Sequence, residues 1–297
     1  MGSIAHADDD PFVVHRSLLF TVAYEMLGSA ADAEDVLQES WLRWAMVERS
    51  EIRDPRAYLV RIITRQALNQ LRSVSRRRED YVGEWLPEPL LTSPDVADDV
   101  ELAESVSIAM LTVLETLGPS ERAVFVLREV FDVPYEEIAD AVGKTTATVR
   151  QIAHRAKDHV AARRPRVHIV RSEHEQVVGQ LVTALNTGDL QGLMDVLAPD
   201  VVSIADSGGK VRGAARRPVV GAVRLARYLV AGMAKVEGEF EATVMWVNGQ
   251  PGIRMELDGQ LVGVISLTVE EGRIARIYSV ANPDKLRRLD EEAALSR

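Results

Sequence analysis

The side chains with the clearest chemical use lie on a predicted helix at residues 147–157. Its apolar positions would pack inward and leave facing outward Thr148, Arg150, Gln151, His154 and Arg155. Arginine can bond guanine, and glutamine adenine, through paired hydrogen bonds in the major groove of duplex DNA, while the other side chains mostly reach phosphates or methyl groups. A shorter predicted helix, 135–142, precedes this one across Gly143, which is the form of a helix-turn-helix. The pattern favours duplex DNA binding over a helical hairpin with a solvated basic face.

A second set of polar side chains lies on an earlier predicted helix, 56–78. Spacings of 4, 4 and 3 residues place on one face Arg61, Arg65, Asn69 and Arg72. Beside the polar segment 46–54, arginines in this position could hold unpaired bases by stacking and by phosphate contact. The alternative is a soluble helix end favoured by the helix dipole. The residues alone leave both interpretations open.

A third set combines acids with an aromatic ring near residue 35. It consists of Asp32, Glu34, Asp35, Gln38, Glu39 and Trp41. The carboxylates could bind a metal ion, but no histidine lies nearby, and acids are common in the first turns of a helix. A protein-docking face with Trp41 as its anchor explains the acids and the ring together. We therefore expect a protein partner here and no metal.

The C-terminal part offers weaker candidates for chemistry. The segment Asp206–Lys210 resembles a phosphate-binding loop only superficially, because it lacks the full glycine and lysine spacing, and a flexible turn is the favoured interpretation. An acid–base pair could be drawn from His174, Asp195, Asp200, Asp206 and Asp258. Single acids near helix ends and turns are ordinary capping residues, so we expect no catalytic residue and no cofactor.

Helical periodicity predicts the elements that position the first three sets. The spacing of apolar residues predicts helices over residues 12–78, with breaks at Gly28 and Pro55 and with Ser29 as an N-cap. From Glu79 to Glu104 there are nine acids and no Lys or Arg. This stretch also contains Pro87, Pro89 and Pro94, which break helices, so it is predicted to be a linker.

Helices resume over residues 97–164 and give way to strands later in the chain. One amphipathic helix is predicted from Val106 to Leu117, stopped by Gly118 and Pro119, with Ser120 as the cap of the next helix. Two more helices are expected at 177–185 and 220–236. Residues 239–280 alternate in twos around three hairpin turns, Asn248–Gly249, Asp258–Gly259 and Glu271–Gly272. The C-terminal part is therefore predicted to be an α+β domain with an antiparallel sheet.

Composition limits the class of protein. The chain has 297 residues, 46% of them apolar, and no cysteine, which excludes disulfide frameworks and thiolate zinc sites. It has no apolar run of membrane-spanning length, so we expect a cytoplasmic protein with no membrane partner. The net charge of −10 argues against a freestanding DNA-binding protein. However, the acid-free block 61–78 and the basic block 144–171 lie on either side of the acidic linker, so charge is segregated along the chain.

Several of these segments together resemble one known family. They are Leu27–Ser29, Asp32–Glu39, Arg56–Leu59, Tyr135–Ala139 and Thr148–Arg150, and over residues 12–164 they resemble bacterial extracytoplasmic-function (ECF) sigma factors. The linker segment Trp85–Pro89, the loop Asp206–Lys210 and the segment Asn282–Lys285 are similar to the subgroup with a fused SnoaL-like domain. Ser207 stands where that subgroup would have a third glycine.

The resemblance implies a multidomain architecture. Two all-α sigma domains, the second with the helix-turn-helix, would precede a C-terminal α+β SnoaL-like (NTF2-like cone) domain. The implied boundaries are 1–78 for region two, 79–100 for the acidic linker, 101–167 for region four and 168–297 for the SnoaL-like regulatory domain.

The resemblance also implies a role for each set of residues. The set from Asp32 to Trp41 would bind core RNA polymerase, Arg61, Arg65, Asn69 and Arg72 the minus-ten element, and the set from Thr148 to Arg155 the minus-thirty-five element of promoter DNA. A regulatory set would comprise Trp85, Pro87, Asp206, Gly208, Gly209, Lys210, Asn282, Pro283 and Asp284. An unidentified small ligand of the C-terminal domain would regulate only by binding two arrangements with different affinity. The alternative is a SnoaL-like enzyme or small-molecule sensor fused to a DNA-binding module.

Overall fold

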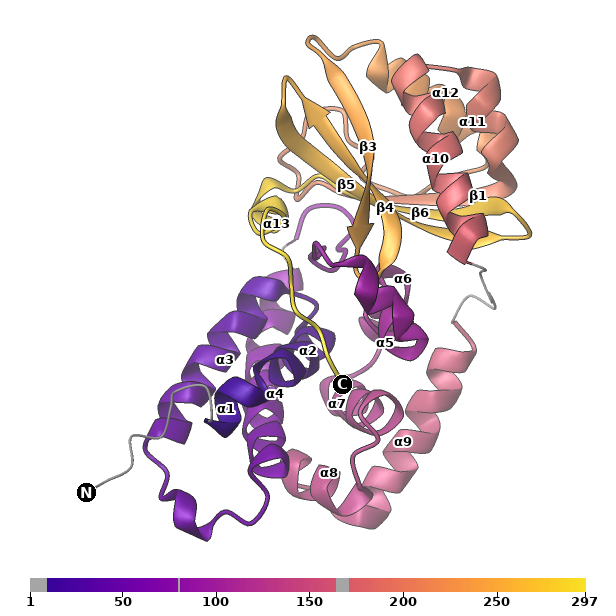
Figure 1. The fold of residues 1–297 in the computed structure, drawn as a ribbon. Coiled ribbons are helices and arrows are strands. Elements are labelled where there is room, and N and C mark those ends of the chain that lie inside the picture. The colour runs from indigo at the N-terminus through magenta and orange to yellow at the C-terminus, as the bar shows by residue number, and fades with distance from the viewer. Residues whose placement is uncertain (1–9, 80, 164–170) are drawn as a thin grey trace. The chain divides into compact units, whose positions relative to one another are not determined.

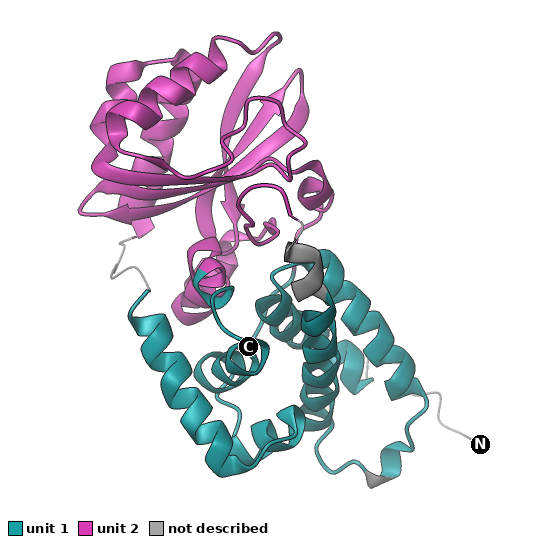
Figure 2. Cartoon of the chain, turned by 180° about the vertical axis from the view of Figure 1, so that it is seen from behind, with its two compact units in different colours: residues 1–79, 113–163, 294–297 teal, residues 80–112, 164–293 magenta. Residues whose placement is uncertain are grey.

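The chain folds into two compact units. The structure, a computed structural model, describes residues 10–79, 81–163 and 171–297, without the side chains of residues 51 and 74–79 (Figure 1). Unit 1 comprises residues 1–79, 113–163 and 294–297, and unit 2 comprises residues 80–112 and 164–293 (Figure 2). The predicted domain boundary at 167/168 lies outside the described residues, and the domain boundaries stay predictions.

Unit 1 is helical. Its N-terminal helices are α1 (Pro11–Val14), α2 (Arg16–Leu27), α3 (Ala30–Ala45) and α4 (Pro55–Glu79), with a 3₁₀ turn at Arg49–Glu51. Gly28 ends α2 in the left-handed region, at φ 68°, and the Ser29 hydroxyl then accepts a hydrogen bond from the Asp32 amide at 3.2 Å. Proline at the first position of α4 supplies a backbone angle that already suits a helix. The predicted break and cap are confirmed here.

The later helices of unit 1 are α7 (Pro119–Phe125), α8 (Tyr135–Val142) and α9 (Thr146–Ala161), with a π turn at Val126–Val130. Gly143, in the left-handed region, ends α8, and the Thr145 side chain caps α9. A buried arginine joins the two helical groups. Arg122 on α7 is 2% exposed, and its Nε donates to the Glu25 carbonyl of α2 at 2.8 Å. Its Nη1 lies 2.7 Å from the Glu115 carboxylate, and burial lowers the pKa of Arg122 to about 10.

Unit 2 is an α+β domain with the linker packed against it. Within the described residues its helices are α5 (Val100–Ser105), α6 (Ile108–Leu114, which continues into unit 1), α10 (Arg171–Thr187), α11 (Leu190–Val196), α12 (Ala222–Met233) and α13 (Pro283–Leu286). Its strands are β1 (Leu197–Asp206), β2 (Val219–Val220), β3 (Phe240–Val247), β4 (Gln250–Leu257), β5 (Gln260–Glu270) and β6 (Arg273–Val280). They form one sheet in the order β2-β1-β6-β5-β4-β3.

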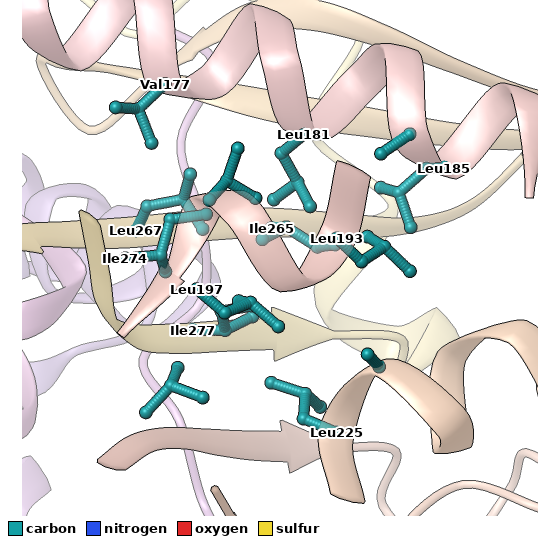
Figure 3. Close-up of a cluster of buried hydrophobic side chains, with 14 of the residues drawn as sticks. Val177, Leu181, Leu185, Leu193, Leu197, Leu225, Ile265, Leu267, Ile274 and Ile277 are labelled. Carbon is teal, nitrogen blue, oxygen red and sulfur yellow. The ribbon is translucent and has the colours of Figure 1, made fainter. Parts of the chain in front are cut away.

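The sheet has an apolar layer on each face. Alternate residues of a strand point to opposite faces, so Ile265 and Ile277 join one cluster while Val264 and Tyr278 join the other. The first cluster packs α10, α11 and α12 against the sheet (Figure 3). The second includes Leu86 of the linker. The two layers explain why the linker remains on this domain: its apolar side chains complete a core.

The predicted fold class is confirmed, and so are the antiparallel hairpins of residues 239–280, where β3, β4, β5 and β6 pair one after the other. The helix predicted from Val106 to Leu117 is shorter in the structure: the Ser107 hydroxyl accepts from the Met110 amide at 3.1 Å, and α6 runs from Ile108 to Leu114. Gly118, not Ser120, caps α7, because Pro119 already occupies the first helical position. The sheet as a whole is mixed, since β1, which precedes the predicted run of hairpins, pairs in parallel with β6.

Among the described helices, none combines the length and apolar character needed to cross a bilayer.

Candidate functional site

The helix-turn-helix presents its predicted DNA-reading residues on the outer side of α9. Val149, Ile152, Ala153, Ala156 and Val160 are buried. The opposite side exposes all five predicted side chains, Thr148, Arg150, Gln151, His154 and Arg155. Arg150 lies 3.6 Å from the Glu136 carboxylate and 5.5 Å from the Tyr135 ring centre, and His154 lies 2.9 Å from Asp158. These contacts are solvent-exposed, so DNA phosphates could replace them at small cost.

The predicted minus-ten residues on α4 do not share one environment. Arg65 donates from Nη2 to the Asp140 carbonyl of α8 at 2.8 Å, and Arg61 lies 3.9 Å from the Asp140 carboxylate. Arg61 also packs over the Tyr58 ring, 5.0 Å from its centre. Asn69 and Arg72 are exposed.

A cavity of about 470 Å³ lies between the segment 47–61 and the acids Glu137 and Asp140 of α8. Helix α8 of the helix-turn-helix therefore places carboxylates against the arginines that would meet DNA phosphates.

Part of the predicted acidic set on α3 lies on an exposed face. Asp35 and Gln38 are exposed. Trp41 is 37% exposed, and its ring centre lies 5.2 Å from that of Phe12 in an edge-to-face arrangement. Next to it, Leu42 and Met46 are 58% and 81% exposed. An acidic rim around exposed apolar side chains suits a protein partner.

The other acids of this set have partners within unit 1. Asp32 accepts from Gln70 at 2.8 Å, Glu34 pairs with Arg16 at 2.9 Å, and the hydrogen bond from Arg43 lowers the pKa of Glu39. No group of three or more metal-ligating side chains occurs in the described part of the chain.

Three residues of the predicted regulatory set, Trp85, Asp206 and Asn282, meet at one site in unit 2. Together with Tyr81, Leu86 and Lys285 they form what we call the linker cluster. Its centre is the Asp206 carboxylate at the end of β1, which is 0% exposed. Oδ2 accepts from the Leu86 amide at 2.9 Å and from the Lys285 ammonium at 2.7 Å. Oδ1 accepts from the Tyr81 hydroxyl and from the Gly208 amide. Four donors thus converge on one carboxylate.

Lys285 closes the linker cluster from the other side. Its Nζ also donates to the Leu86 carbonyl, so both backbone groups of this linker residue are bonded within unit 2. The same nitrogen lies 3.3 Å from the centre of the Trp85 ring, and that ring meets Tyr81 edge-on at 4.7 Å. Burial, and then the neighbouring Asp206 carboxylate, raise the pKa of Tyr81. The Tyr81 hydroxyl therefore remains a donor to Asp206.

Close packing and backbone conformation explain why glycines occupy the loop after Asp206. Gly208 and Gly209 have φ angles of +57° and +72°, in the left-handed region. A Cβ on Gly208 would lie 2.6 Å from the side-chain nitrogen of Asn282. A Cβ on Gly209 would lie 2.9 Å from the Val82 side chain. The flexible-turn interpretation of this loop is wrong in one respect, because the loop packs closely against residues of the linker cluster and of the linker.

The segment after β6 contacts both the glycine loop and the linker cluster. Asn282 is 4% exposed, caps α13, and donates to the Tyr81 hydroxyl at 2.8 Å. Pro283 is the first residue of α13, and Asp284 pairs with Lys210, which lowers the pKa of Asp284. Pro87 of the linker is buried.

Four side chains in these contacts were not among the predicted sites. Tyr81 and Lys285 belong to the linker cluster, and their signals were available, since Tyr81 precedes Trp85 by four residues and Lys285 directly follows the Asn282–Asp284 segment. Asn248 was predicted only as a hairpin turn, yet it exchanges hydrogen bonds with Leu90 and donates to the Val106 carbonyl. Thr92 accepts from the Gly249 amide at 2.9 Å. No local pattern marks these last two contacts.

The acid–base candidates of the C-terminal part do not come together. His174 is 3% exposed, and burial lowers its pKa to about 4. Asp195 accepts from Gln191, and Asp258 accepts from the Glu239 amide. Within the described ranges, no hydrogen bond or ion pair joins any two of the five candidates. Ordinary capping and packing roles account for those contacts.

Comparisons with known proteins agree with this arrangement. Residues 12–77 match the family model Sigma-70 region 2, and residues 107–160 match Sigma-70, region 4. Two helical regions of this kind define a sigma-70-type transcription factor.

Relatives that span nearly the whole chain narrow the class further. The chain is 37% identical over 291 residues to the ECF RNA polymerase sigma factor SigJ of Mycobacterium tuberculosis, covering 92% of this chain and 91% of that protein. It is 34% identical over 278 residues to the probable ECF RNA polymerase sigma factor SigI of the same species, covering 92% of each. The crystal structure of SigJ matches with 34% identity and a TM-score of 0.73, over 93% of this chain and 97% of that one. This chain belongs to the ECF RNA polymerase sigma factors.

Proposed function

We propose that this chain directs core RNA polymerase to promoter DNA, and that its C-terminal domain regulates that activity by holding the linker. The exposed face of α3 would bind the polymerase. Arg61, Arg65, Asn69 and Arg72 of α4 would bind the minus-ten element, and the outer side of α9 would read the minus-thirty-five element. The observation that carries the regulatory part is the linker cluster, where Asp206 and Lys285 bond both backbone groups of Leu86.

The geometry of unit 1 supports a closed resting state. Two promoter elements centred about 25 base pairs apart lie ~85 Å apart along straight duplex, at about 3.4 Å per base pair. Here Arg65 of α4 touches Asp140 of α8, the helix that directly precedes α9. Helix α9 has 16 residues, hence a length of about 24 Å. Because the two DNA-binding faces are this close, they cannot reach both elements until the α4–α8 contact opens.

The linker cluster supplies a means of regulating that opening. The linker follows α4 directly and leads to the helices of region four. A linker bonded through Leu86 to the C-terminal domain cannot lie extended along the polymerase at the same time. We therefore expect release of the linker to precede, or to accompany, productive binding.

Promoter-directed transcription with purified core polymerase tests both parts of the proposal. The samples are the intact chain, a chain ending at Val167, and the full chain with Lys285→Met, which weakens the linker cluster without removing the domain. We expect initiation to depend on the protein, to be lost when Arg61, Arg65, Arg150 and Arg155 are replaced by alanine, and to rise with Lys285→Met. Failure to bind core polymerase would refute the first part. Output unchanged both by the truncation and by Lys285→Met would refute the regulatory part.

The alternative, an enzyme using Asp206 in the C-terminal domain, gains no support from the geometry. A carboxylate offers about four acceptor positions, and Asp206 uses them for Tyr81, Leu86, Gly208 and Lys285. No position is left for a substrate proton while the linker is in place.

A further inference from the structure

Unit 2 has a strongly basic surface to which the function proposed above assigns no role. Residues 207–236 contain seven Lys and Arg and no Asp or Glu, in a chain whose net charge is −10. Lys210 pairs with Asp284. The other six are exposed and have no ion-pair partner among the described residues: Arg212, Arg216, Arg217, Arg224, Arg227 and Lys235. We call these six residues the basic surface.

The basic surface is held in a defined shape. Helix α12 buries Ala222, Leu225 and Ala226 against the apolar cluster of unit 2, and its Arg224 and Arg227, three residues apart, share the outer side. The Tyr228 hydroxyl of α12 accepts from the Ala215 amide at 2.9 Å and donates to the Gly213 carbonyl at 3.2 Å. These two bonds fix the loop that carries Arg216 and Arg217 to the helix, so both sets of arginines are preorganised.

The arginines surround a shallow depression. Arg216, Arg217 and Arg224 line a cavity of about 390 Å³ together with Tyr228 and the apolar side chains of the loop. No ion pair within the described chain joins the basic surface to the acids of the neighbouring elements, Asp195 on α11 and Asp200 on β1. Like charges three residues apart on a helix repel each other, so this arrangement costs stability unless an anion binds it.

We propose that the basic surface binds the phosphate backbone of duplex DNA, as a contact additional to those of α4 and α9. Several arginines spread over a loop and a helix of 12 residues, about 18 Å long, match a row of phosphates better than a single small anion. Arginine suits the task, since its planar donors bond phosphate oxygens in pairs. The choice of DNA over another polyanion rests on the proposed function, in which this chain already meets promoter DNA.

The test measures binding of the full-length protein to a labelled 30-base-pair duplex that lacks any promoter, by fluorescence anisotropy between 50 and 200 mM salt. All proteins carry Arg150→Gln and Arg155→Gln, so that α9 contributes little. Onto this background we add Arg216→Gln, Arg217→Gln and Arg224→Gln. A matched control instead adds Arg273→Gln, Arg276→Gln and Arg288→Gln, which remove the same charge from exposed arginines of the same unit.

Each phosphate contact contributes about 0.9 to the slope of log K against log salt. We therefore expect the basic-surface variant to lose ~2.7 from that slope, and on the order of 10²-fold in affinity near 0.1 M salt. The control should change much less on both measures. Equal losses in the two variants, or none in the basic-surface variant, would overturn the proposal. The assay contains neither polymerase nor promoter sequence, so its result is independent of whether the chain acts as a sigma factor.

Discussion

Replacing Lys285 by methionine should loosen the linker from the C-terminal domain. The side chains of Lys285 and Asp206 are 8% and 0% exposed. Methionine keeps most of the volume of lysine but leaves the Asp206 carboxylate buried without its cation. Removing one partner of a buried ion pair costs about 3–5 kcal/mol. We expect the linker site to open more often by a factor of ~10² or more, since 1.4 kcal/mol is a factor of ten.

Hydrogen exchange at the Leu86 amide measures this opening, because that amide donates to Asp206. A second readout is the fluorescence of Trp85, whose ring lies 3.3 Å from the Lys285 nitrogen. Lys210→Met is the matched control. Lys210 also pairs with an aspartate, Asp284, but the two side chains are 47% and 48% exposed. Exposed pairs contribute little, so exchange at Leu86 should change by less than about threefold.

The double variant Asp206→Asn with Lys285→Met separates the charge effect from lost packing. Both members of the pair are then neutral, and such replacements are often close to neutral in stability. Leu86 should regain much of its protection relative to Lys285→Met alone. Wild-type protection of Leu86 in the single variant would refute the reasoning, because it would mean that the buried pair does not hold the linker.

Three further changes test other parts of the structure. Gly208→Ala should destabilise unit 2 more than Gly213→Ala, by thermal unfolding, because both have positive φ but only the Cβ at 208 would collide, with Asn282 at 2.6 Å. Burial holds the pKa of His174 at about 4, below its usual 6.5. The free energy of unfolding should therefore fall by about 3 kcal/mol as the pH drops from 6.5 towards 4. His174→Leu should flatten that part of the pH profile in denaturant titrations. Arg122→Met should lower the free energy of unfolding of unit 1 by about 3 kcal/mol or more, and hence its denaturation midpoint, because it leaves the Glu115 carboxylate without its cation. A midpoint equal to that of the wild type would contradict the assigned contacts.

The helices were predictable from sequence because their signals are local. Gly28, Ser29 and Thr145 end or cap helices through bonds to residues within four positions, and buried positions recur at helical spacing along α9. The hairpin turns at 248, 258 and 271 were recognisable for the same reason, and the structure places Asn248, Asp258 and Glu271 at positive φ.

The missed elements depend on partners distant in sequence. Strand β1 pairs in parallel with β6, more than 70 residues later, so nothing within β1 specifies its partner. The later start of α6 was missed because Val106 continues the apolar periodicity of Met110, Val113 and Leu114.

The site residues divide along the same line. The outer face of α9 follows from helical spacing alone, whereas the contact of Arg65 with Asp140 joins residues 75 positions apart. The linker cluster brings together three segments, and only a resemblance to known sequences pointed to them together. Asn248 shows the limit most clearly: as a turn residue it was predictable, and as a support for the linker it was not, because that role depends on Leu90 and Val106.

The burial of Leu86 has a consequence for finding effectors of this protein. Suppose that the polymerase binds only the form in which Leu86 is released. A molecule that favours the bound form of Leu86 then weakens the affinity of this protein for polymerase by some factor. By linkage, polymerase weakens the affinity of this protein for that molecule by the same factor. Candidate effectors can therefore be screened without labelling them, by measuring how far each shifts a polymerase titration. The sign of the shift reports whether a compound is an inhibitor or an inducer.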